Sequence, residues 1–140
     1  MKTLLLLPAA FALFALPTLD TAGAPRGEHD WLVDPSHSSV VFRVKHANAS
    51  WFQGTFDKIE GSVTYDPAKP EATAVTLKIP VDSVDTNDAK RDAHLKGGDF
   101  FDAGENPAIV FQSSKVAKKG EVLEVTGTLA ARSGFGSVSV

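Results

Sequence analysis

The chain has 140 residues, which is enough for one ordinary domain. Its 14 basic and 17 acidic residues give a formal net charge of −3, and no basic block is present to meet phosphates, so we expect no nucleic-acid partner. The chain contains no cysteine, which excludes disulfides, thiolate metal sites and a cysteine nucleophile.

Residues 1–24 have the layout of a secretory signal peptide. Lys2 provides a positive start, residues 4–16 are uncharged and almost wholly apolar, and residues 22–24 are small. The apolar run is short for a permanent anchor, and no other stretch approaches the roughly 20 residues that a membrane span needs. We expect export to the periplasm and a domain over 25–140. The cut site stays open, because Pro25 follows the best cleavage match and is unfavourable there.

Alternation of apolar and polar residues dominates the chain from Asp30 onward, as in strands with one buried face. Within 38–46, for example, Val40, Phe42 and Val44 alternate with outward-facing Arg43. The same period predicts strands over 54–65, 73–82, 108–117 and 122–131. In 54–65 the parity changes near residues 59–61, which predicts a bulge or bend, and the inward candidates are Phe56, Val63 and Tyr65. The short turn at 118–121 predicts that the last two segments form a hairpin.

One segment, 87–96, has a helical pattern. Thr86 or Asn87 is the expected N-cap, Asp88 would lie in the first turn, and Gly97 would end the helix. Five or six strands with one short helix and no alternation of strands and helices predict an all-β antiparallel barrel or sandwich.

The four histidines are the main candidates for catalysis or metal binding. None of His29, His37, His46 and His94 is paired at a spacing typical of metal ligands. A small histidine-dependent metal, haem or enzymatic protein using His37, His46 or His94 remains the alternative function. Asp34, Ser36 and His37 are nearly consecutive, whereas triad residues converge from separate elements, so we predict no catalytic residue and no cofactor.

An aromatic cluster offers a different function. Phe100 and Phe101 are adjacent in a polar segment, and Phe111 follows on the next predicted strand. These side chains could plug one end of a barrel, or they could line the mouth of an apolar cavity that holds an elongated ligand.

The order and spacing of several motifs resemble the YceI family of polyisoprenoid-binding proteins over residues 30–129. The matching segments are WLVDPSHS (31–38), VVFRVKH (40–46), GTF (54–56), GSVTYDP (61–67), SVDT (83–86), KRDAHL (90–95), DFFD (99–102) and NPAIVFQS (106–113). The resemblance implies an exported, lipocalin-like antiparallel barrel, without catalytic activity, that holds an isoprenoid or similar amphiphilic lipid in its apolar bore.

The resemblance also implies which residues contact that lipid. The implied tail-lining positions are Phe42, Val44, Phe56, Val63, Val75, Leu77, Ile79 and Phe111, with Phe100 and Phe101 near an opening. Four polar positions match the family and could orient a head group or brace a loop: His46, Arg91, Asp92 and His94.

The C-terminal segment departs from the family pattern. Family members continue after the strand that ends near residue 129 with a further hairpin and more strands, whereas residues 133–140 here do not match. We therefore expect an incomplete barrel whose open edges favour aggregation or a homodimer. A fragment and a frameshifted product are both compatible with this pattern.

Cell fractionation tests the predicted leader. We expect the protein in the periplasm, shortened by roughly two dozen residues at its N-terminus, because the leader would be removed on export. Intact mass spectrometry of the periplasmic protein measures the shortening. Full-length protein in the cytosol would contradict the prediction.

Overall fold

The computed structural model describes residues 27–132 and 134–139, so the leader predicted at 1–24 lies outside the described residues. No helix in the described part is long and apolar enough to cross a membrane. The elements are β1 (Asp30–Leu32), β2 (Val40–His46), β3 (Ser50–Phe56), β4 (Glu60–Thr64), η1 (Pro70–Ala72), β5 (Ala74–Pro80), η2 (Val81–Ser83), β6 (Val84–Asp85), α1 (Ala89–Lys96), β7 (Ala108–Lys119), β8 (Val122–Ala131) and β9 (Gly134–Ser139).

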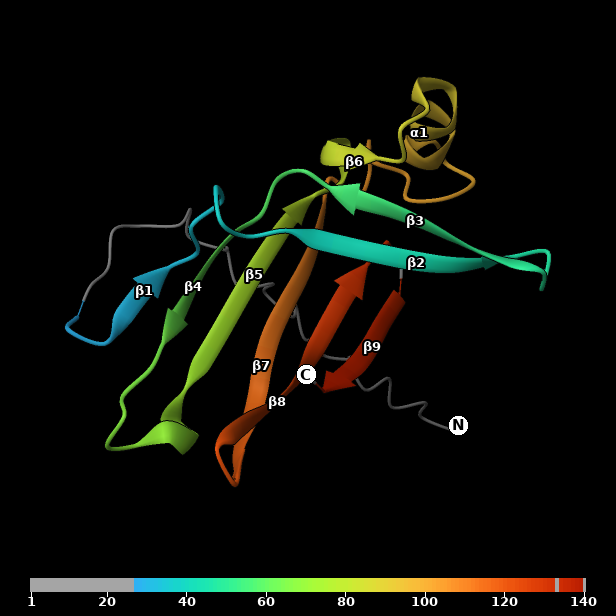
Figure 1. Ribbon diagram of the computed structural model, residues 1–140. Helices are drawn as coiled ribbons and strands as arrows, with labels where there is room; N and C mark the ends of the chain where they lie inside the picture. Colours follow the sequence, from blue (N-terminus) through green and yellow to red (C-terminus); the bar gives the residue numbers. More distant parts are fainter. Residues whose placement is uncertain (1–26, 133, 140) are drawn as a thin grey trace, which may run out of the picture.

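The strands form two antiparallel sheets. One sheet has six strands in the order β1-β4-β5-β7-β8-β9, and the other has three in the order β2-β3-β6. β2 and β3 run crosswise over one end of the six-stranded sheet, and α1 lies next to β6 (Figure 1). The predicted all-β, antiparallel, lipocalin-like fold is confirmed, although the sheets do not close into a barrel over the described residues.

The structure has nine strands in its described part, where the sequence predicted five or six. β1 and β6 are too short to produce a visible alternation. The predicted strand over 54–65 is two strands in different sheets, because β3 pairs with β2 and β6 while β4 pairs with β1 and β5. The parity change near residues 59–61 therefore marks the crossing between sheets. Tyr65, expected to point inward, is 37% exposed.

The helix begins two residues later than predicted. Asp88 is the N-cap, and its carboxylate accepts hydrogen bonds from the backbone N–H groups of Lys90 and Arg91, both at 3.0 Å. The Arg91 N–H and charge, with the Lys90 N–H, lower the pKa of Asp88. The expected caps, Thr86 and Asn87, were wrong. Thr86 is buried, and Asn87 has a left-handed backbone with φ of 62°.

The predicted hairpin of the last two segments is confirmed as β7 and β8, and it contains an irregularity that the alternation alone did not predict. Positions 111 and 116 differ by five, so simple alternation would place Phe111 and Val116 on opposite faces of the strand, yet both are buried. The β7–β8 register shifts between Ser113 and Lys115. The extra residue of this bulge returns Val116 to the face that carries Phe111.

The core lies where the crosswise strands, the six-stranded sheet and the segment around α1 meet. Its buried members are Phe56, Ile79, Val81, Val84 and Ile109. The ring of Phe56 lies 5.5 Å from that of Phe42 and 5.6 Å from that of Phe101, between centroids. Edge and tilted ring contacts at such separations stabilise beyond the burial of apolar area alone.

Gly54 tests how tightly the crosswise strands pack. Phe42 pairs with Gly54 across β2 and β3, and a Cβ on Gly54 would collide with the ring of Phe42. We expect Gly54→Ala to lower the free energy of unfolding by about 1–3 kcal/mol, as overpacking does. Gly104→Ala is the control, because its Cβ would meet nothing within 4 Å. Urea denaturation measures both, and equal stability of the two variants would contradict the tight packing.

Candidate functional site

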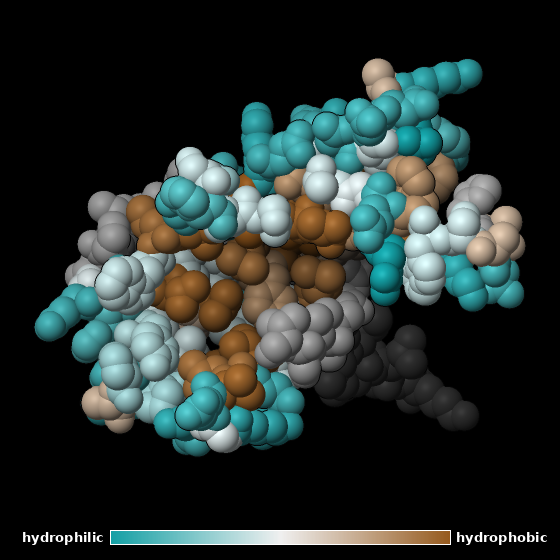
Figure 2. Space-filling model, viewed as in Figure 1, coloured by the Kyte–Doolittle hydropathy of each residue, from teal (hydrophilic) through white to brown (hydrophobic). Residues whose placement is uncertain are grey.

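A cavity of about 720 Å³ lies between the crosswise strands, the helix and the end of β8. Most of its lining is apolar and comes from four segments distant in sequence. Figure 2 shows hydrophobic residues gathered in a hollow over the six-stranded sheet, beneath the crosswise strands. The residues that line the cavity are Phe42, Val44, Phe52, Arg91, Leu95, Asp99, Phe100, Phe101, Ala131 and Arg132.

Strand register explains why one wall of this cavity is aromatic. Val44 pairs with Phe52 across β2 and β3, so both side chains lie on the face that also carries Phe42. Loop 97–103, which follows α1, supplies Phe100 and Phe101 to the same cavity. Phe101 packs against the core, whereas Phe100 is 45% exposed and forms part of the rim.

Arg91 joins the helix to the cavity wall. Its guanidinium carbon lies 4.4 Å from the ring centroid of Phe52, which is a cation–π contact. Its Nε donates to the Thr86 hydroxyl at 2.8 Å, and Nη2 donates to the Thr86 carbonyl at 2.7 Å. The carboxylate of Asp92 accepts from the backbone N–H and the hydroxyl of Thr86. Arg91 and Asp92 thus brace the segment before the helix, and Arg91 also faces the cavity.

Arg132 fixes the loop on the other side of the cavity. It follows β8 with a left-handed φ of 49°, and its Nη1 donates to the Phe100 carbonyl at 2.6 Å. Its Nη2 donates to the carbonyl of Gly98. These charge-assisted bonds hold the backbone of the loop that presents Phe100 to the cavity.

The remaining tail-lining candidates lie outside this cavity lining. Phe56, Ile79 and Phe111 are buried in the protein interior. Val63 pairs with Val75, and both are half-buried. Leu77 is half-buried and pairs with Phe111, so these apolar side chains continue one face of the six-stranded sheet away from the cavity.

The histidines do not gather at one site. His94 packs edge-on against Phe100 at 4.9 Å between ring centroids, and its Nε2 lies 3.7 Å from the Asp99 carboxylate. His37 shares a 2.7 Å hydrogen bond with Asp34, which, with the Ser36 N–H, lowers the pKa of Asp34. The side chain of His46 lies outside what the structure describes. No group of three or more potential metal ligands occurs among the described residues.

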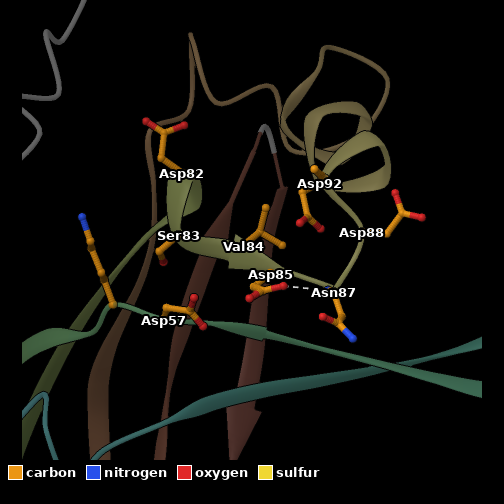
Figure 3. A pocket seen from close by; sticks show the side chains of 10 residues that line it. Asp57, Asp82, Ser83, Val84, Asp85, Asn87, Asp88 and Asp92 are labelled. Carbon is orange, nitrogen blue, oxygen red and sulfur yellow. Dashed lines mark hydrogen bonds between the residues drawn. The ribbon is translucent and has the colours of Figure 1, made fainter.

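A second, polar pocket of about 610 Å³ lies beside β6 and the start of α1, and it has a different character (Figure 3). Several of its carboxylates already have protein partners. Asp85 accepts from the Asn87 N–H at 2.6 Å, Asp57 accepts from a threonine hydroxyl at 3.0 Å, and Asp88 caps the helix. These carboxylates shape the turns at this end of the molecule.

The cavity brings together five of the predicted contact residues and five that sequence reasoning missed. Those it brings together are Phe42, Val44, Arg91, Phe100 and Phe101. Those missed are Phe52, Leu95, Asp99, Ala131 and Arg132. Phe52 was missed because the predicted strand began at Gly54, and the weak turn before Ser50 concealed the start of β3.

The chain is similar to known proteins over most of its length. The family model described as YceI-like domain matches residues 31–134. A UPF0312 protein of Pseudomonas paraeruginosa is 40% identical over 130 residues, which cover 91% of this chain and 64% of that relative. The chain thus spans less than two thirds of the length of this curated relative.

Solved structures agree with the fold. The crystal structure of Burkholderia cenocepacia BcnA matches with a TM-score of 0.71 and 32% identity, over 77% of this chain and 68% of that one. A domain from Saccharophagus degradans, described as polyisoprenoid-binding and implicated in plant cell wall breakdown, matches with a TM-score of 0.52 and 15% identity. That match covers 86% of this chain and 66% of the domain, and at this identity it supports the fold alone.

Thr86 tests the bracing network beside the cavity. It is 5% exposed, and its hydroxyl bonds both Arg91 and Asp92. We expect Thr86→Val to lower the free energy of unfolding by about 1–3 kcal/mol, because the charged groups of Arg91 and Asp92 both lose a hydrogen bond to a buried hydroxyl. Thr86→Ser keeps the hydroxyl and should lose less. Chemical denaturation compares them, and a Val variant as stable as the Ser variant would show that the hydroxyl contributes nothing.

Proposed function

The chain belongs to the YceI-like family, and we propose that it is a non-catalytic binding protein for a polyisoprenoid or similar long-chain amphiphile. The observation that carries the proposal is the cavity of about 720 Å³, whose wall contains four phenylalanine rings. Ligand cavities of this size are typically apolar with few polar groups, and here the polar groups are Arg91, Asp99 and Arg132.

The energetics favour a long apolar tail. Each buried CH₂ contributes about 0.8 kcal/mol, so ten carbons outweigh any single polar contact. The rings of Phe42, Phe52 and Phe101 supply a rigid apolar surface that loses little conformational entropy when a chain lies against it. The half-buried face of Val63, Val75 and Leu77 extends the apolar surface beyond the cavity and could carry the distal part of a longer tail.

The polar groups of the cavity suit the other end of an amphiphile. Arg91 and Arg132 use part of their donors on backbone carbonyls, and Asp99 lies in the same lining. A head group with hydrogen-bond acceptors would meet the guanidinium groups, while the tail occupies the aromatic wall. Site chemistry supports this assignment independently of fold likeness.

Localisation follows from the same proposal. The layout of residues 1–24 supports export, and a periplasmic protein that sequesters a poorly soluble lipid would carry it through an aqueous compartment. The polyisoprenoid-binding description of the Saccharophagus degradans domain is consistent with such a ligand for this fold.

Ligand loading of delipidated protein tests the proposed cavity. Phe42→Asp places a carboxylate against apolar side chains, where its burial without a partner costs several kcal/mol, so we expect loading of a detergent-dispersed polyprenol to fall at least about tenfold. Phe100→Asp should act in the same direction, and folding is less at risk there because this side chain is partly exposed. Organic extraction and mass spectrometry measure the bound polyprenol.

Val41→Asp is the matched control. Val41 is adjacent to Phe42 but points to the opposite face of β2 and is 60% exposed. Its variant should load polyprenol like the parent protein. Unchanged loading in Phe42→Asp and Phe100→Asp, with both variants folded by circular dichroism, would contradict the proposed function.

A further inference from the structure

The β2–β3 hairpin differs from the rest of the chain in its charge. Residues 38–56 contain Arg43, Lys45 and His46 but no acidic residue, whereas the whole chain has a net charge of −3. The nearest acidic residues in sequence are Asp34 and Asp57, which flank the base of the hairpin. Asp85 of β6 pairs with Thr55 at this base, so the cationic segment is the part of the hairpin that lies toward its turn.

Strand register gathers the cationic side chains on the face opposite the cavity. Lys45 pairs with Trp51, and the guanidinium carbon of Arg43 lies 4.4 Å from the centroid of the Trp51 ring. Val41 lies on the same face by alternation. Trp51 is 58% exposed and Val41 is 60% exposed, so an amphipathic indole and an apolar side chain flank two cations at the surface.

The hairpin is also placed to approach a flat surface. In Figure 1 its turn extends beyond the six-stranded sheet, at the opposite side of the molecule from β1. The turn residues are small, and Ala47 and Asn48 adopt left-handed backbones with φ of 48° and 57°. A narrow turn without bulky side chains lets the adjoining faces of β2 and β3 reach a partner.

We propose that the outer face of this hairpin, formed by Val41, Arg43, Lys45 and Trp51, docks the protein on an anionic lipid bilayer. Lysine and arginine near an anionic membrane surface are attracted to it, and tryptophan favours the interfacial region between head groups and tails. The opposite face of the same strands lines the cavity, so docking leaves the single layer of β2 and β3 between the cavity and the lipids.

The charge and the exposed side chains favour a bilayer over other partners. The two cations of this face are few for nucleic acid, whose binders neutralise several phosphates. An anionic bilayer binds a surface that combines a few cations with an exposed indole. Such binding is weak, so the protein can leave the membrane again. The inference extends the proposed function from holding a lipid to the surface from which the lipid is collected.

Single-tryptophan variants of the full chain provide the first test. The chain has two tryptophans, so Trp31→Phe leaves Trp51 as the reporter, and Trp51→Phe leaves Trp31 on β1. With vesicles of equal parts phosphatidylcholine and phosphatidylglycerol, Trp51 fluorescence should shift to the blue and be quenched by bromine-labelled lipid. Trp31 should show neither effect. Quenching of Trp31 in place of Trp51 would overturn the assigned face.

Charge variants provide the second test by vesicle flotation. Arg43→Gln with Lys45→Gln should weaken partitioning onto the anionic vesicles about 30-fold, since each cation near such a surface contributes about fivefold. Lys115→Gln with Lys118→Gln removes the same charge from exposed positions on β7 and should change little. Every variant carries the same N-terminal residues, so their difference isolates the hairpin. Equal weakening of both pairs would overturn the proposal.

Two further measurements distinguish docking on a bilayer from self-association of the chain. Raised salt and pure phosphatidylcholine vesicles should each remove the difference between the two pairs of variants, because the attraction is electrostatic. Light scattering without vesicles detects a second copy of the chain on this face, and a dimer broken by the hairpin variants would replace the bilayer as the occupant. Phe42→Asp should still dock although its polyprenol loading falls, so failure of the cavity and failure of the docking face are distinguishable.

Discussion

The packing of Phe56 between Phe42 and Phe101 is the contact on which the rest of the architecture depends. Among the described strands no ladder of backbone hydrogen bonds joins the two sheets, so side-chain packing must fix their relative position. Phe56 lies at the end of β3, is 4% exposed, and belongs to the cluster that contains residues of β5, β6 and β7. Because that junction occupies one end of the crosswise strands, their other side chains remain available to line a cavity.

In this arrangement the two faces of the β2–β3 hairpin have different roles. A strand sends alternate side chains to opposite faces, so seven residues of β2 serve two surfaces at once. The even-numbered residues Phe42 and Val44 face the cavity, and the odd-numbered Arg43 and Lys45 face away from it. No single residue of β2 both lines the cavity and forms the outer face. Both faces nevertheless depend on the same strand register and on the close approach of Phe42 to Gly54.

Periodicity predicted the fold because a strand with one buried face has apolar residues at every second position, as Val75, Leu77 and Ile79 of β5 show. Cavity residues such as Phe42 and Phe101 were found for the same reason or through the family resemblance. Arg132 could not be found this way, because its role is to bind the carbonyls of Gly98 and Phe100, and backbone acceptors have no sequence signature. The helix start was misplaced because Thr86, Asn87 and Asp88 are all residue types that cap helices. Asn87 adopts a left-handed backbone, which the sequence does not reveal, and the cap is the next residue, Asp88.

The bonds of Arg132 also constrain the order in which the molecule assembles. Arg132 lies 32 and 34 positions beyond the two residues whose carbonyls it binds, so closing that contact costs more chain entropy than closing the β7–β8 hairpin. During synthesis, loop 97–103 leaves the ribosome well before its anchor exists. The local hairpin and helix can form before the contact between Arg132 and loop 97–103, which needs β8 to be complete. Strands β1 to β8 therefore precede in synthesis the residue that holds the loop at the mouth of the cavity.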